Sequence, residues 1–405
     1  MRCLTTLPTC LSTALVCLLA ARGPAAAAAE GPASIERLDP AFAVRDADGE
    51  WLWYEPLRLT IEGRGWNDTE RPFDRLPGRA RGTVRDAVWS LSRHAAGLGV
   101  RFRTDALTIA ARWTLSSAEV AMPHMPATGV SGLDLYARDD GAWRWIGAGR
   151  PSGTTSRVVL AAGIPAVQGG DATDGGAGHL RDYLLMLPLY NGVESLEIGV
   201  PPAATIAPAP AAHADDRPIV FYGTSITQGG CASRPGMAYP AILRRRLDRP
   251  VINLGFSGNG RLDPEVGTLL AEIDAAAYVL DCAGNMTAQM AADRTAPFVR
   301  ALRAARPDTP IVLVGTLNYP AGVILPASRE TVAAKNEVLR AAFDRLTNEG
   351  VAGLSFIPGD ALLGTDGDGT VDGTHPTDLG FLRMADAIEP PLRRILGSDA
   401  RVPPP

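Results

Sequence analysis

The fold class is indicated by the stretch Pro218-Ile-Val-Phe-Tyr-Gly-Thr-Ser225-Ile-Thr-Gln-Gly-Gly230, an apolar run that passes into a loop rich in glycine. A strand buried on both faces of a parallel sheet has such a run, without alternating polar residues. Similar runs recur at residues 251–254, 277–280, 311–314 and 353–357, and helical patterns separate them at 239–247, 290–305, 329–348 and 379–395. This alternation predicts a doubly wound α/β domain over residues 218–396, with its site at the carboxyl ends of the strands.

The preceding part of the chain has a different pattern. Residues 30–200 contain short β-branched or alternating runs, for example at 100–104, 107–113 and 195–200. Two alternating runs, 132–138 and 142–146, flank the sequence Asp139-Asp-Gly141, and an Asp-Gly turn in this position is a strong hairpin signal. We therefore predict an N-terminal β-sandwich domain. The Ala- and Pro-rich residues 201–217 are expected to form a linker, and residues 397–405 a C-terminal tail.

Residues 1–29 are typical of a secretory signal peptide. Arg2 provides positive charge, residues 11–19 form a short apolar stretch, and residues 25–29 are small alanines suited to cleavage. Val16 stands where a lipidated Cys17 would require a small residue, which disfavours a lipid anchor. We expect a secreted or periplasmic protein with no stable membrane insertion after signal cleavage.

The composition is that of a globular protein. The chain has 405 residues, 46% hydrophobic and 20% charged, with a net charge of −5, so no basic surface indicates nucleic acid or anionic membrane as a partner. Beyond the expected signal peptide only Cys231 and Cys282 remain. They form one disulfide or are two buried thiols, and the sequence leaves this choice open, as it does the oligomeric state.

The tryptophans are unevenly distributed. All seven precede residue 146, at positions 51, 53, 66, 89, 113, 143 and 145. Most are expected to fill the core of the sandwich, and the alternative is that one or two stack on sugar rings from an exposed position.

Three of the predicted strands are followed by segments with candidate functional residues. Ser225 follows the first strand, Gly258 lies in the glycine-rich residues 253–260, and Asn285 ends the segment 281–285. Each has an ordinary alternative when taken alone: a helix cap for the serine, and turn residues for the glycine and the asparagine.

A fourth segment, Asp372-Gly-Thr-His375-Pro376, places a carboxylate three residues before an imidazole near the C-terminus. A serine hydroxyl attacks an acyl carbon efficiently only when a base removes its proton. His375 can be that base when a carboxylate accepts its Nδ1 proton and so fixes the tautomer. The four segments together therefore predict a Ser225, His375 and Asp372 triad.

These four segments, in this order, resemble blocks I, II, III and V of the SGNH (GDSL-type) hydrolases. The resemblance implies a flavodoxin-like SGNH hydrolase fold, with Ser225 as nucleophile and Asp372 and His375 completing the triad. It also implies an oxyanion hole made of the Ser225 N–H, the Gly258 N–H and the Asn285 amide. Thr224 departs from the aspartate of the family motif, and Ala283 and Met286 replace the residues that commonly flank the block III asparagine.

The string Gly132-Leu-Asp-Leu-Tyr136 is similar to the GxDLY domain that precedes one bacterial branch of these hydrolases. That resemblance implies a jelly-roll-like sandwich beside the catalytic domain.

We expect a serine esterase that hydrolyses small acyl esters, above all acetyl esters on carbohydrates. No metal or other cofactor is expected, because the histidines are few and not clustered. The alternatives are an acyltransferase that passes the acyl group to an alcohol, and a non-catalytic carbohydrate-binding protein.

Overall fold

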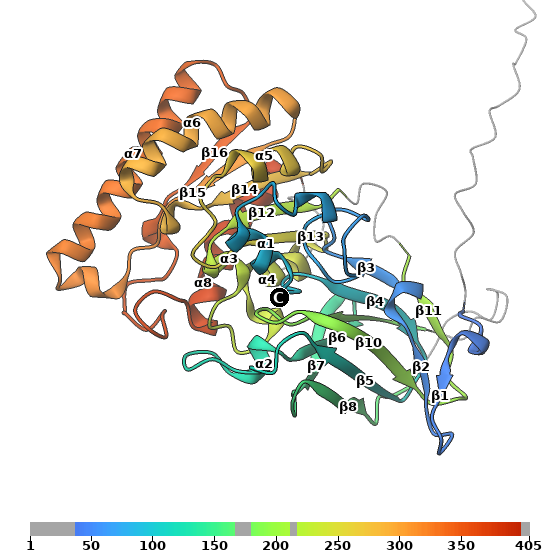
Figure 1. Ribbon diagram of the computed structural model, residues 1–405. Coiled ribbons are helices and arrows are strands. Elements are labelled where there is room, and N and C mark those ends of the chain that lie inside the picture. Colours follow the sequence, from blue (N-terminus) through green and yellow to red (C-terminus); the bar gives the residue numbers. More distant parts are fainter. Residues whose placement is uncertain (1–36, 167–179, 211–216, 398–405) are drawn as a thin grey trace, which may run out of the picture. The chain divides into compact units, whose positions relative to one another are not determined.

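A computed structural model describes residues 37–166, 180–210 and 217–397, and a five-stranded parallel sheet organises its C-terminal half, residues 217–397 (Figure 1). The strands are β12 (Ile219–Gly223), β13 (Val251–Gly255), β14 (Ala277–Asp281), β15 (Ile311–Val314) and β16 (Leu354–Ile357). Their order, β13-β12-β14-β15-β16, is the 2-1-3-4-5 order of flavodoxin-like doubly wound sheets. The register aligns Gly255, Gly223 and Asp281, so the three segments after these strands leave the same edge of the sheet.

Successive residues of a strand point to opposite faces of the sheet, so each apolar strand presents apolar side chains on both faces. Helices cover both faces. Ile219 and Phe221 join a core that includes residues of α4 (Tyr239–Leu247) and α8 (Asp378–Ile395). Val220 and Tyr222 join a second core with the remaining long helices, α5 (Pro264–Leu270), α6 (Ala288–Ala305) and α7 (Pro326–Asn348). The runs of apolar residues are explained by this burial on two sides. Among the described residues, no helix is both long enough and apolar enough to cross a membrane.

Two antiparallel sheets form the N-terminal half, residues 37–210 apart from 167–179, and they fit a β-sandwich. The first has the order β1 (Val44–Arg45), β2 (Leu52–Tyr54), β10 (Val193–Val200), β5 (Thr108–Leu115), β8 (Thr155–Ala162). The second has the order β11 (Ile206–Pro208), β4 (Gly99–Thr104), β9 (Arg181–Met186), β6 (Leu133–Asp139), β7 (Ala142–Gly149), and β3 (Thr60–Glu62) also pairs with β4. Their inward side chains share one core, for example Trp113 from the first sheet and Phe102 from the second. Two short helices, α1 (Asp86–Ser92) and α2 (Ala127–Val130), belong to this half.

The predicted hairpin is present as β6 and β7. Asp140 and Gly141 join the strands, and both have positive φ, 48° and 75°, as a type I′ turn requires. Part of the stretch expected to be a linker is a strand, since Ile206–Pro208 pairs with Phe102–Thr104 at the edge of the second sheet. Residues 1–29, 211–216 and 398–405, which include the expected signal peptide and tail, lie outside the described residues.

The expectation that the tryptophans serve mainly the sandwich core needs correction. Trp53 and Trp113 are buried in the N-terminal half, but Trp66 joins the core around α5 and α6 and donates its indole N–H to Glu272 at 2.7 Å. Trp89 and Trp143 also pack against cores that contain C-terminal residues. The local sequence pattern shows that a tryptophan is apolar enough to be buried. Which residues bury it depends on how the two halves of the chain pack together.

The N-terminal half contributes to the cores on both faces of the parallel sheet. Leu184 and Met186 join the core with α4 and α8, whereas Leu76 and Val84 join the core with α5 and α6. Burial of apolar side chains stabilises a fold in proportion to the area removed from water. The two halves are therefore expected to depend on each other for stability.

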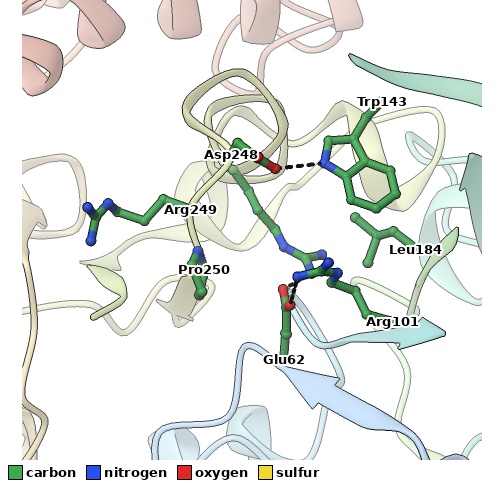
Figure 2. A pocket seen from close by; sticks show the side chains of 8 residues that line it. Glu62, Arg101, Trp143, Leu184, Asp248, Arg249 and Pro250 are labelled. Atoms are coloured by element: carbon green, nitrogen blue, oxygen red, sulfur yellow. Dashed lines mark hydrogen bonds and ion pairs between the residues drawn. The ribbon is translucent and has the colours of Figure 1, made fainter. Parts of the chain in front are cut away.

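Buried polar contacts also link the halves. Glu62 on β3 lies between Arg101 on β4 and Arg244 on α4, while Asp248 after α4 accepts from the indole of Trp143 at 3.2 Å (Figure 2). Burial raises the pKa of Glu62, but the two guanidinium groups outweigh it and lower the pKa. The cavity among these residues has a volume of about 10 Å³, which leaves room for about one water molecule. This region is therefore a packed contact between the two halves and not a substrate site.

Candidate active site

Ser225 begins the short helix α3 (Ser225–Gln228), directly after strand β12. Thr224 caps this helix, because its hydroxyl oxygen accepts from the N–H of Ile226 at 3.2 Å. The carbonyl of Ser225 accepts from Gly230 N–H at 2.8 Å and from the Tyr190 hydroxyl at 3.2 Å. Ser225 is only 7% exposed, which is less than a serine at an open strand edge would be.

The structure brings the three predicted triad residues into one hydrogen-bonded line. Ser225 Oγ lies 2.9 Å from His375 Nε2, and His375 Nδ1 lies 2.7 Å from Asp372 Oδ2. An ionised carboxylate only accepts hydrogen bonds, so Nδ1 carries the imidazole proton and Nε2 accepts from the serine hydroxyl. This arrangement can remove the proton of Ser225 as the oxygen attacks an acyl carbon.

A tight turn holds Asp372 and His375 together. Asp372 Oδ1 accepts from the N–H of Thr374 at 3.0 Å and from that of His375 at 2.8 Å, and Val371 N–H donates to the His375 carbonyl at 2.8 Å. Burial raises the pKa of Asp372, but the hydrogen bonds from His375 and Thr374 outweigh it and lower the pKa to about 2. The carboxylate is therefore ionised at neutral pH. The hydrogen bonds of the turn hold it next to the imidazole of His375.

Gly258 lies in the loop after β13 and faces solvent. Its φ is +69°, in the left-handed region, and no atom lies within 4 Å of the position that a Cβ would occupy. Gly260 in the same loop has a different role, because a Cβ there would stand 1.8 Å from the carbonyl oxygen of Gly223. Glycine at 260 thus lets the loop pack against the end of β12, next to Ser225, and glycine at 258 leaves the space before the loop open.

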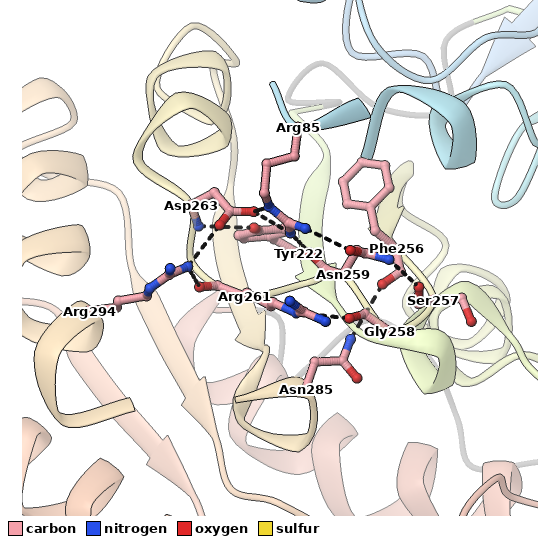
Figure 3. Close-up of polar contacts among 10 residues, drawn as sticks. All are labelled: Arg85, Tyr222, Phe256, Ser257, Gly258, Asn259, Arg261, Asp263, Asn285 and Arg294. Carbon is pink, nitrogen blue, oxygen red and sulfur yellow. Dashed lines mark hydrogen bonds and ion pairs between the residues drawn. The ribbon is translucent and has the colours of Figure 1, made fainter. Parts of the chain in front are cut away.

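Asn285 ends the short 3-10 helix η5 (Ala283–Asn285) and supports the same loop. With its amide oxygen toward the loop, it accepts from the N–H groups of Gly258, Asn259 and Gly260 at 3.3, 3.0 and 3.2 Å. In the opposite amide orientation the nitrogen lies 3.4 Å from the Phe256 carbonyl (Figure 3). The first orientation pairs donors with acceptors, so two of the expected oxyanion donors, Gly258 and Asn285, contact each other.

Two arginines of the N-terminal half hold strand β13 and the loop that follows it, and nothing in the local sequence indicates these contacts. Arg85 donates to Asn259 Oδ1 at 2.7 Å, to the Asn259 carbonyl at 2.8 Å and to Asp263 at 2.7 Å (Figure 3). Arg75 is 2% exposed and donates to the carbonyls of Asn253 and Gly255 at 3.1 and 2.6 Å. Burial lowers the pKa of Arg75 to about 9, and these carbonyls satisfy a guanidinium that is taken out of water.

A buried carboxyl group contacts the helix that begins with Ser225. Asp281 Oδ2, at the end of β14, accepts from Thr227 of α3 and from Tyr239 of α4, both at 3.0 Å. Burial raises the pKa of Asp281 to about 7, and the two hydroxyl donors lower it only in part. Asp281 thus ties the helix that begins with Ser225 to the sheet.

His124 lies next to His375, and the sequence analysis did not single it out. It lies in the N-terminal half between β5 and α2, and its ring centre is 5.7 Å from that of His375. Cys231, just after α3, and Asp372 lie at the same place, since ligand atoms of these four residues all fall within 4.8 Å of one another. The expectation of unclustered histidines is therefore wrong, because residues 251 positions apart in the chain meet only in the tertiary structure.

Both cysteines within the described residues are free thiols. Cys231 and Cys282 are buried and form no disulfide, which resolves the choice left open by the sequence. Burial, and then the charge of Asp372, raises the pKa of Cys231 to about 12. Cys231 also has a φ of +72°, an unusual backbone conformation for a residue with a side chain.

A cavity of about 400 Å³ lies beside the segment that carries Asp372 and His375. Tyr319, Val332 and Leu363 are among its apolar lining. Asp360 and Gly369 come from the segment before the turn that carries Asp372 and His375, which we call the triad turn. The hydroxyl of Tyr319 would be 3.8 Å from a Cβ at Gly284, the neighbour of Asn285, so the cavity adjoins the predicted oxyanion region. Its volume is in the range of small-molecule sites.

Comparisons with known proteins agree with this architecture. A family model of the GDSL-like lipase/acylhydrolase family matches residues 216–393, and a model of the N-terminus of SGNH-type esterases matches residues 51–206. No curated protein matches the chain significantly.

Three solved structures are similar to the chain. A candidate GDSL-like lipase from Bacteroides ovatus is 38% identical with a TM-score of 0.79, over 86% of this chain and 98% of that one. A salicylyl-acyltransferase from a tetracycline biosynthetic pathway is 20% identical (TM-score 0.65; 85% and 96% covered). An acetyl xylan esterase from the rumen bacterium Butyrivibrio proteoclasticus is 13% identical (TM-score 0.54; 87% and 100% covered), and these last two share the fold. The chain belongs to the GDSL-like (SGNH) lipase/acylhydrolase family and carries the GxDLY N-terminal domain of SGNH-type esterases.

Proposed function

We propose that the protein is a serine esterase that forms an acyl-enzyme on Ser225. The observation that carries this proposal is the continuous line from Ser225 Oγ to His375 Nε2 at 2.9 Å and from His375 Nδ1 to Asp372 at 2.7 Å. The low pKa of Asp372, about 2, supports the same assignment, because the carboxylate stays ionised and stabilises the imidazolium that forms during attack.

The proposed reaction has two halves. Ser225 Oγ attacks the ester carbonyl while His375 takes the hydroxyl proton, and the tetrahedral intermediate collapses as His375 returns that proton to the departing alkoxide. Water then attacks the acyl-serine with His375 as base, which releases the carboxylic acid and restores the hydroxyl. In this proposal the N–H of Ser225 and the amide NH₂ group of Asn285 stabilise the oxyanion. The N–H of Gly258 joins them by exchanging its 3.3 Å contact with the Asn285 oxygen, the longest of the three that this oxygen accepts, for the oxyanion.

Small acyl groups, acetyl above all, on carbohydrate alcohols are the proposed substrates. The 400 Å³ cavity beside the triad turn supports this, because its lining mixes apolar surface with polar side chains that suit hydroxyl-bearing ligands. The polar members of the lining include Asn318, Ser328, Arg329, Asp360 and Thr365. A sugar of one or two rings fits this volume, and in this proposal its ester reaches from the cavity to Ser225, which does not itself line the cavity.

The proposal is tested with purified protein and a panel of acetylated sugars and p-nitrophenyl esters of increasing chain length. We expect a burst of p-nitrophenol equal to the enzyme concentration, as an accumulating acyl-enzyme gives, and a preference for acetyl. Ser225→Ala should lower kcat about 10⁴-fold or more without changing the thermal midpoint. A Ser225→Ala variant within about tenfold of the wild type would exclude Ser225 as the nucleophile.

The same assay separates the two alternative functions. An added alcohol that captures most of the acyl group in place of water would identify an acyltransferase. Binding of carbohydrate without turnover of any ester would identify a non-catalytic protein. Hydrolysis that predominates in the presence of candidate acceptors supports the esterase.

A further inference from the structure

Four side chains that metals favour as ligands converge at the mouth of the candidate active site. His124 comes from the N-terminal half, Cys231 follows α3, and Asp372 and His375 lie in the triad turn. One nitrogen, sulfur or oxygen atom from each lies within 4.8 Å of the corresponding atoms of the other three. Two imidazoles, a thiolate and a carboxylate are donors that Zn²⁺ accepts in four-coordinate sites.

The spacing requires only a small contraction around an ion. In a tetrahedral zinc site with bonds of about 2.0–2.3 Å, ligand atoms stand roughly 3.3–3.8 Å apart. The 4.8 Å limit of the present cluster therefore exceeds these ligand spacings by roughly 1.0–1.5 Å at most. His124 is exposed on its loop, whereas Cys231 is 5% exposed, so the thiol lies on the buried side of the cluster and the imidazole on its solvent side.

We propose that His124, Cys231, Asp372 and His375 form a binding site for Zn²⁺ whose occupancy reversibly inhibits the enzyme. Binding replaces the thiol proton of Cys231, which passes to solvent, by a zinc–sulfur bond, and no electron is transferred. A metal on either nitrogen of His375 removes the lone pair or the tautomer that proton transfer from Ser225 needs. The inhibitory effect rests on the proposed esterase function, whereas the site itself does not.

His124 and Cys231 give this cluster its specificity for a metal. Our proposed reaction uses neither residue, and they come from different halves of the molecule, yet both present ligand atoms to the triad turn. Replacing either one should leave esterase activity in place and remove a ligand. Even partners outside the first coordination shell typically affect metal affinity 10- to 100-fold, so loss of a direct ligand should cost at least tenfold.

The test is a titration of the full-length enzyme with ZnCl₂ in the absence of chelator, with p-nitrophenyl acetate as substrate. We expect inhibition that EDTA reverses, and a half-inhibitory Zn²⁺ concentration at least tenfold higher in both His124→Ala and Cys231→Ser. Cys282→Ala is the matched control, because Cys282 is also a buried free thiol but lies outside the cluster, and it should be inhibited like the wild type.

A second readout is independent of activity. Co²⁺ bound to the Ser225→Ala variant should give a thiolate-to-metal charge-transfer band that disappears when Cys231→Ser is added. Unchanged Zn²⁺ inhibition in both His124→Ala and Cys231→Ser, or Co²⁺ binding without the thiolate band, would overturn the site. Failure of the metal-free enzyme to hydrolyse any ester would instead count against the proposed function, and the Co²⁺ spectrum would still decide the site.

Discussion

The two halves of the molecule contribute to the candidate site in different ways. Every residue proposed to react or to stabilise charge belongs to the C-terminal half, where Ser225, Gly258 and Asn285 follow adjacent strands of the parallel sheet. The N-terminal half contributes residues that hold or border these groups, among them Arg85 on the Gly258 loop and Tyr190 on the carbonyl of Ser225. The comparison teaches that an antiparallel module can be part of an active site without supplying its chemistry.

Separating the halves should have the largest effect. Residues 217–405 alone would expose the apolar surfaces on both sheet faces that Leu184, Met186, Leu76 and Val84 now cover. We expect this fragment to be insoluble, or to lose its cooperative thermal transition and its activity on p-nitrophenyl acetate, when compared with residues 30–405. A soluble fragment with equal activity and equal thermal stability would show that the halves are independent.

Asn285→Ala should have the next largest effect, because it removes a proposed oxyanion donor and a support of the Gly258 loop together. We expect kcat to fall about 10²- to 10³-fold, with a smaller change in KM. Asn348→Ala, at the end of α7, is the control and should match the wild type. A rise in KM alone would make Asn285 a substrate-binding residue and place the oxyanion hole elsewhere.

Arg85→Ala tests whether the N-terminal half positions the loop of Gly258, a proposed part of the oxyanion hole. Loss of its contacts to Asn259 and Asp263 should let the loop shift, and a displacement of about 1 Å can cost up to about 10²-fold in rate. We expect kcat to fall roughly tenfold with little change in KM. Arg81→Ala is the matched control, since Arg81 pairs with Glu70 inside the N-terminal half. Equal kinetics of the two variants would mean that the grip of Arg85 on the loop is only structural.

The smallest effect concerns the buried carboxyl group of the C-terminal half. The pKa of Asp281 is about 7 in the folded protein against an ordinary 3.8, so between these pH values the folded state holds a proton that the unfolded chain has lost. Stability from this group is complete below about pH 4 and is lost as the pH rises through 7.

The side chain in the Asp281→Asn variant cannot ionise, so the variant does not lose this stability as the pH rises. The thermal midpoint of the variant minus that of the wild type should therefore increase by roughly 5 °C between pH 4.5 and pH 7.5. Asp274→Asn, an exposed carboxyl in the same half, should show no such trend. A parallel pH dependence of the Asp281→Asn variant and the wild type would contradict the raised pKa.

Much of the fold followed from periodicity. The apolar runs of the parallel sheet identify strands that are buried on both faces, and all five lie where the sequence analysis placed them. The turn at Asp140 and Gly141 could also be predicted, because a type I′ turn needs positive φ at both positions and the Asp-Gly pair favours it. The strand Ile206–Pro208 was missed, because an Ala- and Pro-rich stretch at a sheet edge has no alternating pattern.

The amino-acid sequence alone determined which residues are candidates for the chemistry: Ser225, Gly258, Asn285 and the Asp372–His375 pair all lie in short segments with a recognisable order. It did so because local segments encode strand ends and turns, and parallel strands bring those ends to one edge. Only the tertiary structure decided that His124 and Cys231 meet the turn of Asp372 and His375. It also decided that Arg75 holds strand β13 and that Arg85 holds the loop of Gly258. These contacts join segments that are far apart in the chain, and their energy depends on packing between the halves, which leaves no periodic trace in the sequence.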